Sequence, residues 1–290
     1  MSGARRKPAG FTMVELMVVV AIIGILIAIL VPALAAAYRH AQNLDCQNNL
    51  RQIAAAVFNY AADYKGSIPP CKYTGTSSLY WCNLLVKGNY LSADDTSQLG
   101  ATEPSSKASV LRCPLATDVF VAEGDSIAYP ATNQGVDKAQ GTARLGNTTG
   151  TTKTTVDCSY YWNGYTANAG NITDVKYKRF PSVAVSPTAT PDVKAALIHD
   201  LSEIRQRTST VLAADGVLFD ADQKSKRGRI AARHPGDAGN NTSTNVVYYD
   251  GHVESIQRVP GADYQFTGDG IQSSTDLDTK VPPLFLLPKR

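Results

Sequence analysis

Two histidines and two aspartates in the second half of the chain carry the side chains that divalent metal ions prefer. They are Asp215, His234, Asp250 and His252. Imidazole and carboxylate ligands together suit zinc or manganese, whereas a site made only of oxygen atoms suits calcium. An interpretation without a metal is simpler and is favoured, in which Asp250 and Gly251 form a tight turn and His234 hydrogen-bonds to a loop backbone. The four residues are a candidate metal site if the fold brings them together.

The five cysteines are spread along the chain, and no two of them form a CxxC pair. This spacing argues against zinc or thioredoxin-like chemistry. In an exported domain, one or two disulfides would persist among four of them, with Cys46 left as the odd thiol. Buried cysteines without disulfides are the alternative. The pairing is not given by the sequence, and the four candidates are Cys71, Cys82, Cys113 and Cys158.

Signs of enzymatic chemistry are few. The chain lacks GxSxG, HExxH and Walker motifs, and it has no GxGxxG at a strand–helix junction. Its four histidines leave few general bases. Aromatic residues between Tyr160 and Tyr165 could line a sugar or peptide groove, but at strand spacing such residues more often pack in a core. We expect a protein that is not an enzyme.

The first element of the chain is an apolar run of sixteen residues, Leu16 to Val31. As a helix this run is about 24 Å long. Apolar flanks extend it to about residues 11–35, which is long enough to span a membrane. Arg5, Arg6 and Lys7 precede it, so this end should stay in the cytoplasm and the rest of the chain should face outward.

Glu15 lies one turn inside the apolar segment. Three interpretations compete: a secretory signal peptide cleaved within Ala33 to Ala37, an uncleaved anchor helix, and a leader that is cut before the apolar run. A carboxylate in such a helix costs up to about 2.5 kcal/mol on insertion scales. Neither a signal peptide nor a plain anchor gains anything from this cost, so Glu15 favours the third interpretation.

The residues Gly10, Phe11, Thr12 and Glu15 resemble the leader of type IV prepilins and type II secretion pseudopilins. A short basic leader ends in glycine, and a glutamate is the fifth residue after the cut. The resemblance implies that a prepilin peptidase cleaves after Gly10 and methylates the new terminus at Phe11. It also implies that Glu15 faces the amine of a neighbouring subunit in a filament built at an inner-membrane assembly platform.

A second resemblance lies in the C-terminal half. His234 followed by Asp250-Gly251, together with Arg112-Cys113-Pro114, is similar to a prepilin-like family of planctomycetes and related bacteria. Fifteen residues separate His234 from Asp250, which is a longer interval than the family usually has. Secretion-type pseudopilins often bind calcium in a C-terminal loop. Here the corresponding oxygen ligands would come from Asp269, Asp276 and Asp278.

The sequence predicts an α+β fold, with a long N-terminal helix packed on an antiparallel β-sheet that has long loops. The helical pattern runs to about Tyr64 and is ended by Gly66 and a proline pair. Asp250-Gly251 between two β-rich runs predicts a hairpin with a two-residue turn. The other short apolar and aromatic runs, which we expect in a β-rich region, are Leu79–Val86, Val110–Cys113, Cys158–Tyr165 and Thr210–Ala214.

These patterns divide the chain into a leader (1–10), a pilin-type helix (11–64) and a periplasmic or extracellular globular part (65–290). The net charge of +3 is carried by the three leader cations, so the remainder is balanced and does not suggest a nucleic-acid partner. We expect a structural subunit that self-assembles into a pilus-like filament or a secretion pseudopilus. The alternative is a membrane-anchored binding module that uses the helix only for export and display.

Overall fold

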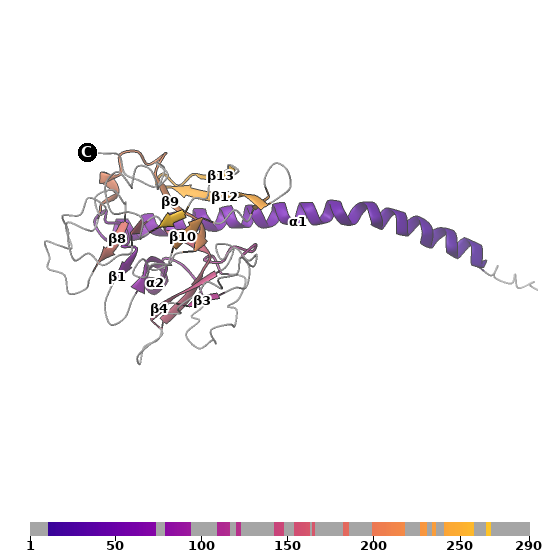
Figure 1. Ribbon diagram of the computed structural model, residues 1–290, viewed down its shortest axis with the longest axis horizontal. Coiled ribbons are helices and arrows are strands. Elements are labelled where there is room, and N and C mark those ends of the chain that lie inside the picture. Colours follow the sequence, from indigo (N-terminus) through magenta and orange to yellow (C-terminus); the bar gives the residue numbers. More distant parts are fainter. Residues whose placement is uncertain are drawn as a thin grey trace, which may run out of the picture. The chain divides into compact units, whose positions relative to one another are not determined.

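The computed structural model describes thirteen stretches of the chain: residues 11–73, 79–93, 109–116, 120–122, 142–147, 154–162, 164–165, 182–185, 199–217, 227–230, 234–235, 241–257 and 265–267. The chain divides into two compact units, Met1–Ala41 and Gln42–Arg290. The second unit holds the C-terminal part of the first helix and all of the described strands (Figure 1).

Helix α1 runs without a break from Met13 to Asp63 and contains Pro32. Its end is set by backbone geometry. Lys65 and Gly66 have positive φ angles of 55° and 94°, and the Gly66 N–H donates to the carbonyl oxygen of Ala61 at 2.7 Å. This is the bond pattern of a Schellman motif, which satisfies carbonyl groups left over at a helix end. The predicted helix and its end near Tyr64 are therefore confirmed.

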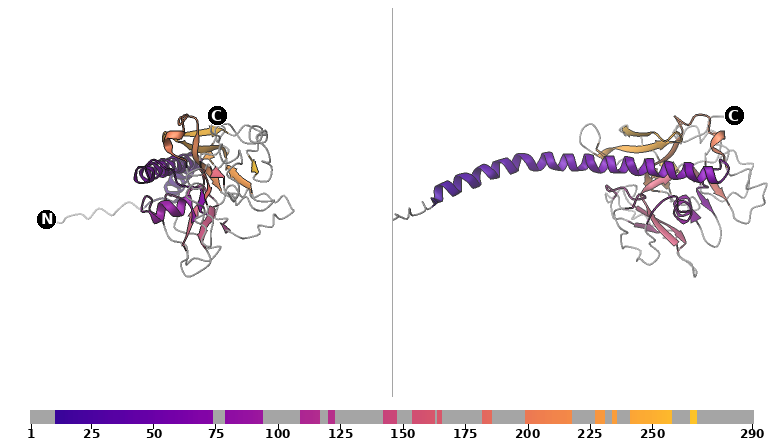
Figure 2. Two further views of the ribbon diagram at one scale, coloured as in Figure 1. Left: turned by 90° about the vertical axis from the view of Figure 1, so that its left-hand side faces the viewer. Right: turned by 180° about the vertical axis from the view of Figure 1, so that it is seen from behind.

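From Gln42 onward, α1 buries one face in the globular unit. Cys46, Leu50, Ile53 and Val57 follow one another at intervals of three or four residues, and each is completely buried. This spacing places them on a single stripe of the helix. They belong to the same hydrophobic core as Val211 and its neighbours in β9 and as Val246, Val247 and Tyr248 of β12. In Figures 1 and 2, hairpin β12–β13 and helix α2 lie on different sides of this part of α1.

The described strands form three sheets. The small sheets are β2-β1-β8-β7 and β3-β4-β5. In the main sheet, hydrogen-bonded neighbours follow the path β11-β12-β9-β10-β14, β13 also pairs with β12, and β6 pairs with β9. The bounds of the strands are β1 Lys72–Tyr73, β2 Leu79–Tyr80, β3 Phe120–Ala122, β4 Thr142–Asn147, β5 Thr154–Cys158, β6 Tyr160–Trp162, β7 Gly164–Tyr165, β8 Ser182–Val185, β9 Val211–Val217, β10 Arg227–Ile230, β11 His234–Pro235, β12 Asn241–Tyr248, β13 Val253–Gln257 and β14 Gln265–Thr267.

Every pairing in the main sheet is antiparallel. Together with α1 this confirms the predicted α+β class. The small sheets differ from the expectation, because β1 pairs with β8, β7 with β8 and β3 with β4 in parallel. Such pairs require long connections rather than tight hairpins.

The predicted hairpin is confirmed as β12–β13, but its turn is longer than predicted. Val247 lies opposite Val253, and the N–H of Tyr248 donates to the carbonyl of His252 at 3.0 Å. Three residues therefore make the loop, Tyr249 to Gly251, and Gly251 has φ +90°. A left-handed glycine at the end of a three-residue loop is a common alternative to the two-residue Asp-Gly turn.

Two of the other apolar runs are not strands over most of their length. The run 79–86 contains only the short β2 and continues as helix α2, Trp81–Lys87. The Tyr80 N–H donates to the Asn83 side-chain oxygen at 3.1 Å, which satisfies one backbone donor at the start of α2. The run 110–113 is a turn, and a short 3₁₀ helix follows later at Leu201–Glu203.

Candidate functional site

The start of α1 is closed by Thr12 and Glu15. The Thr12 N–H and hydroxyl both donate to Glu15 Oε2, at 2.8 and 2.7 Å, and the Glu15 N–H donates to Thr12 Oγ1 at 3.3 Å. This reciprocal pattern is a capping box, whose sequence signature is a threonine followed three residues later by a glutamate. Glu15 thus caps its own helix in the single chain. Gly10 lies outside the described residues.

After this cap, α1 is long and apolar enough to cross a membrane, and the most apolar part of it is not buried by the rest of the chain. Phe11 is 75% exposed, Leu16 55% and Ile29 70%. An apolar helix surface of this length needs lipid or other helices around it. The segment therefore fits a membrane-anchored precursor.

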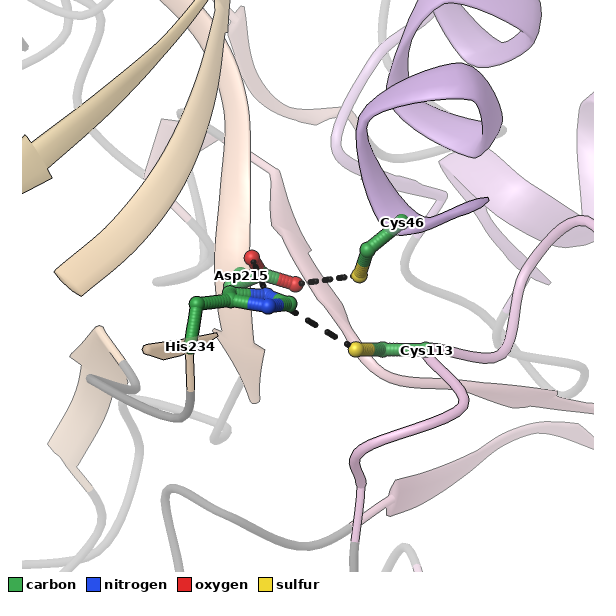
Figure 3. Close-up of side chains that lie close together, drawn as sticks. All are labelled: Cys46, Cys113, Asp215 and His234. Carbon is green, nitrogen blue, oxygen red and sulfur yellow. Dashed lines mark hydrogen bonds and ion pairs between the residues drawn. The ribbon is translucent and has the colours of Figure 1, made fainter. Parts of the chain in front are cut away.

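The second site is a buried polar cluster made by Cys46, Cys113, Asp215 and His234 (Figure 3). One ligand atom of each residue lies within 4.8 Å of those of the other three. The Cys46 thiol donates to Asp215 Oδ1 at 3.3 Å, and His234 Nε2 lies 2.5 Å from Asp215 Oδ2 and 3.8 Å from Cys113 Sγ. None of the four side chains is more than 2% exposed.

The main sheet explains why His234 and Asp215 meet. Ser243 pairs with both His234 of β11 and Gln257 of β13, so these two strands lie on opposite sides of β12. Val247 likewise pairs with β9 on one side and β13 on the other. Strands β9 and β11 therefore follow one another along the same edge of β12, which places their side chains together.

Two groups outside the cluster hold its members in place. The Asn245 N–H donates to Asp215 Oδ2 at 3.1 Å, and the Tyr160 hydroxyl lies 3.2 Å from Cys46 Sγ. Tyr160 and Trp162 are completely buried, and Trp162 stacks on Trp81 with ring centroids 4.8 Å apart. These two aromatic residues are part of the core, as their strand spacing indicated, and do not form a ligand groove.

The structure divides the predicted four-residue metal site. Asp215 and His234 come together, whereas Asp250 and His252 pair with each other on the loop between β12 and β13, with Oδ1 and Nδ1 2.5 Å apart. His252 is exposed and stacks on the Tyr248 ring. Among the described residues, the only converging group of three or more metal-ligating side chains is the buried cluster. The predicted calcium ligands, Asp269, Asp276 and Asp278, lie outside the described residues.

Sequence reasoning missed the two cysteines of this cluster. All five cysteines are buried and none is in a disulfide. The structure therefore shows buried free cysteines, which was the alternative to the expected disulfides. Cys46 is not an isolated thiol, because it shares the cluster with Cys113. A search for CxxC pairs finds ligands that are close in sequence, and it cannot detect residues that come together only in the folded chain.

Burial and neighbouring charge set the protonation of the cluster. Burial alone lowers the pKa of the His234 imidazole, but the Asp215 carboxylate with its hydrogen bond, together with Cys113, outweighs burial and raises this pKa to about 9. Burial raises the pKa of the Cys46 thiol well above its usual value. Without an added cation the cluster thus holds an imidazolium–carboxylate pair beside the protonated thiol of Cys46.

Residues 5–31 match the family model of the prokaryotic N-terminal methylation motif. No curated protein and no solved structure matches the chain. The resemblance of the C-terminal half to a planctomycete family therefore stays a prediction. The matched segment contains Gly10, Phe11 and Glu15 and enters the apolar part of α1. By this motif and the apolar helix that carries it, the chain is prepilin-like at its N terminus.

Proposed function

We propose that this protein is a structural subunit of a type IV pilus-like filament or of a type II secretion pseudopilus. A prepilin peptidase cuts between Gly10 and Phe11 and methylates the new amine. The subunit then leaves the inner membrane at an assembly platform and joins the filament through its apolar helix. The globular part faces the periplasm or the cell surface. The observation that carries this proposal is the methylation motif at the start of an exposed apolar helix.

The exposed face of α1 supports assembly through the helix. Leu16, Ile25 and Ile29 are 55–70% exposed, and they stay in lipid only while the subunit is in the membrane. When a subunit is extracted, this surface must be covered again, because exposing it to water is unfavourable in proportion to its area. Packing against the helices of other subunits covers it without a membrane.

Glu15 has a second task in the proposal. In the single chain its carboxylate is satisfied by Thr12. In the processed filament, the methylated amine of a neighbouring Phe11 is the cation that a carboxylate in apolar surroundings needs. Local capping and assembly thus make different demands on the same side chain: capping needs a hydrogen-bond acceptor, and assembly needs a negative charge.

The variant Glu15→Gln separates these demands. Glutamine serves in a capping box as glutamate does, so we expect the precursor to be made, inserted and cleaved. We expect the sheared-filament fraction to lose the protein at least tenfold. The readout is mass spectrometry of the N-terminal peptide from membrane and sheared fractions, with Glu254→Gln, which lies on β13, as the matched control.

The outcomes assign the function. A peptide that begins at methylated Phe11 in the sheared fraction of wild type, and is lost from that fraction in Glu15→Gln, supports the filament subunit. A terminus between Ala36 and Tyr38 would mean an ordinary signal peptide and would overturn the proposal. Processed protein that never enters the sheared fraction, in wild type as in the variant, would favour an anchored binding module.

A further inference from the structure

We propose that Cys46, Cys113, Asp215 and His234 bind one zinc ion as a closed structural site that ties α1 to the main sheet. This inference goes beyond the filament function and does not depend on it. The four residues come from α1, from the turn 110–113, from β9 and from β11 (Figure 3). Their side chains point to one place from four separate segments.

Two of the distances within the cluster already match those of tetrahedral zinc. Zinc lies about 2.3 Å from thiolate sulfur and about 2.0–2.1 Å from histidine nitrogen. A tetrahedron with such bonds separates its ligand atoms by roughly 3.3–3.8 Å. Cys46 Sγ lies 3.3 Å from Asp215 Oδ1, and Cys113 Sγ lies 3.8 Å from His234 Nε2. The closer pair, His234 Nε2 and Asp215 Oδ2 at 2.5 Å, would separate by less than about 1 Å to admit the ion.

The choice of ligands selects the ion and the type of site. Two sulfurs and an imidazole favour zinc over calcium or magnesium, which prefer oxygen ligands. Four protein ligands without an open position, all of them buried, are typical of structural rather than catalytic zinc. The site binds Zn²⁺ with loss of the thiol protons of Cys46 and Cys113 and of the Nε2 proton of His234, all of which pass to solvent.

Neighbouring groups orient the ligands for this task. The Tyr160 hydroxyl, 3.2 Å from Cys46 Sγ, can donate to the thiolate. The Asn245 N–H donates to Asp215 Oδ2 at 3.1 Å, which leaves Oδ1 as the oxygen directed to the ion. His234 Nδ1 has no hydrogen-bond partner among the described residues, whereas Nε2 lies beside Asp215 Oδ2 and Cys113 Sγ. Nε2 is therefore the ring nitrogen placed to bind the ion. Outer groups of this kind fix ligand direction in metal sites.

Two rivals use the same residues. The first is an ion-free network, in which an imidazolium–carboxylate pair is surrounded by thiols. The two cysteines would contribute little to such a network, because a thiol is a weak hydrogen-bond donor and ordinarily packs as a small apolar residue. The second is a disulfide between Cys46 and Cys113, whose sulfurs lie within 4.8 Å of each other and could close in an oxidising compartment. Both rivals exclude a bound ion and are therefore separable from it.

The test uses the full chain, purified in detergent without a histidine tag. Zinc per chain is measured by elemental mass spectrometry for wild type, Cys46→Ser, His234→Ala and the control Cys71→Ser, which alters an equally buried cysteine outside the cluster. We expect about one zinc per chain in wild type and in the control. We expect at least a tenfold lower content in the two cluster variants.

A second measurement needs no variant and so does not depend on variants that fold. Co²⁺ is titrated into zinc-stripped wild-type protein, and a sulfur-to-cobalt charge-transfer band with the strong visible absorption of tetrahedral cobalt supports the site. Absence of this band, or equal zinc in Cys46→Ser and wild type, would overturn the proposal. So would a Cys46–Cys113 disulfide in peptides from protein whose thiols were alkylated at cell lysis.

Discussion

Two leucines on α1 give a direct test of where the helix joins the globular core. Leu50 is completely buried, whereas Leu44 is 58% exposed, although both lie on the same helix and within the same compact unit. Replacing each by alanine removes the same atoms from the same type of residue. Any difference in stability between Leu50→Ala and Leu44→Ala therefore reports the packing of that position and not the chemistry of the change.

The expected magnitudes follow from burial. Leucine-to-alanine changes in cores cost about 2–5 kcal/mol, since the lost transfer free energy is joined by the energy of the cavity. Leu50 lies at the centre of the buried stripe between Cys46 and Ile53, so we expect about 3 kcal/mol. Leu44 loses little buried area, and alanine is the better helix former, so its change should stay within about 0.5 kcal/mol.

The assay is thermal unfolding of the detergent-solubilised protein, followed by near-ultraviolet circular dichroism, which reports the core tryptophans. For a folded unit of this size, 1 kcal/mol corresponds to about 2–4 °C in Tm. Leu50→Ala should thus lower Tm by about 6–12 °C, and Leu44→Ala by about 2 °C or less. Equal shifts for the two variants would refute the reasoning, because residues 42–63 would then not dock on the sheet by the face described.

Two further changes probe the hairpin and the cluster. Gly251→Ala should cost about 1–2 kcal/mol, because Gly251 has φ +90° and an added Cβ would lie 3.4 Å from the Phe58 ring. Gly24→Ala, at a position inside α1 with nothing within 4 Å, should not lower Tm, because alanine is the better helix former, and a similar loss in both variants would contradict this account. Tyr160→Phe removes the hydroxyl beside Cys46 Sγ and should weaken zinc affinity about 10–100-fold in a chelator competition, with near-unchanged circular dichroism.

The elements that the sequence predicted correctly are those whose signals are local. The glycine after α1 and the Asp-Gly pair of the hairpin act over a few residues, so a helix end and a turn are readable from composition. The run 79–86 shows the limit of this approach. Its apolar residues fit a buried strand or a short helix equally well, and the hydrogen bond from the Tyr80 N–H to Asn83 accompanies a helical start.

The candidate cluster was predictable only in part. Asp215 and His234 have the right side chains, but their meeting depends on β9 and β11 sharing an edge of β12, and no local pattern encodes that. Asp250 and His252 have equally suitable side chains, yet the loop of the hairpin pairs them with each other. Cys46 belongs to the apolar stripe of α1 by its spacing, and only its tertiary neighbours make it a ligand.

The two proposals can fail separately, because they rest on different compact units. Glu15 caps the helix in the unit Met1–Ala41, and the cluster lies in Gln42–Arg290. Changes at distant sites without shared partners add within about 0.5 kcal/mol. Glu15→Gln should therefore abolish filaments while zinc content and Tm stay at wild-type values. His234→Ala should lose zinc and lower Tm while the cut after Gly10 continues, because cleavage depends on the leader and not on the folded globular unit. If His234→Ala lost both the zinc and the cut after Gly10, the cluster in the sheet would govern how α1 is presented for processing.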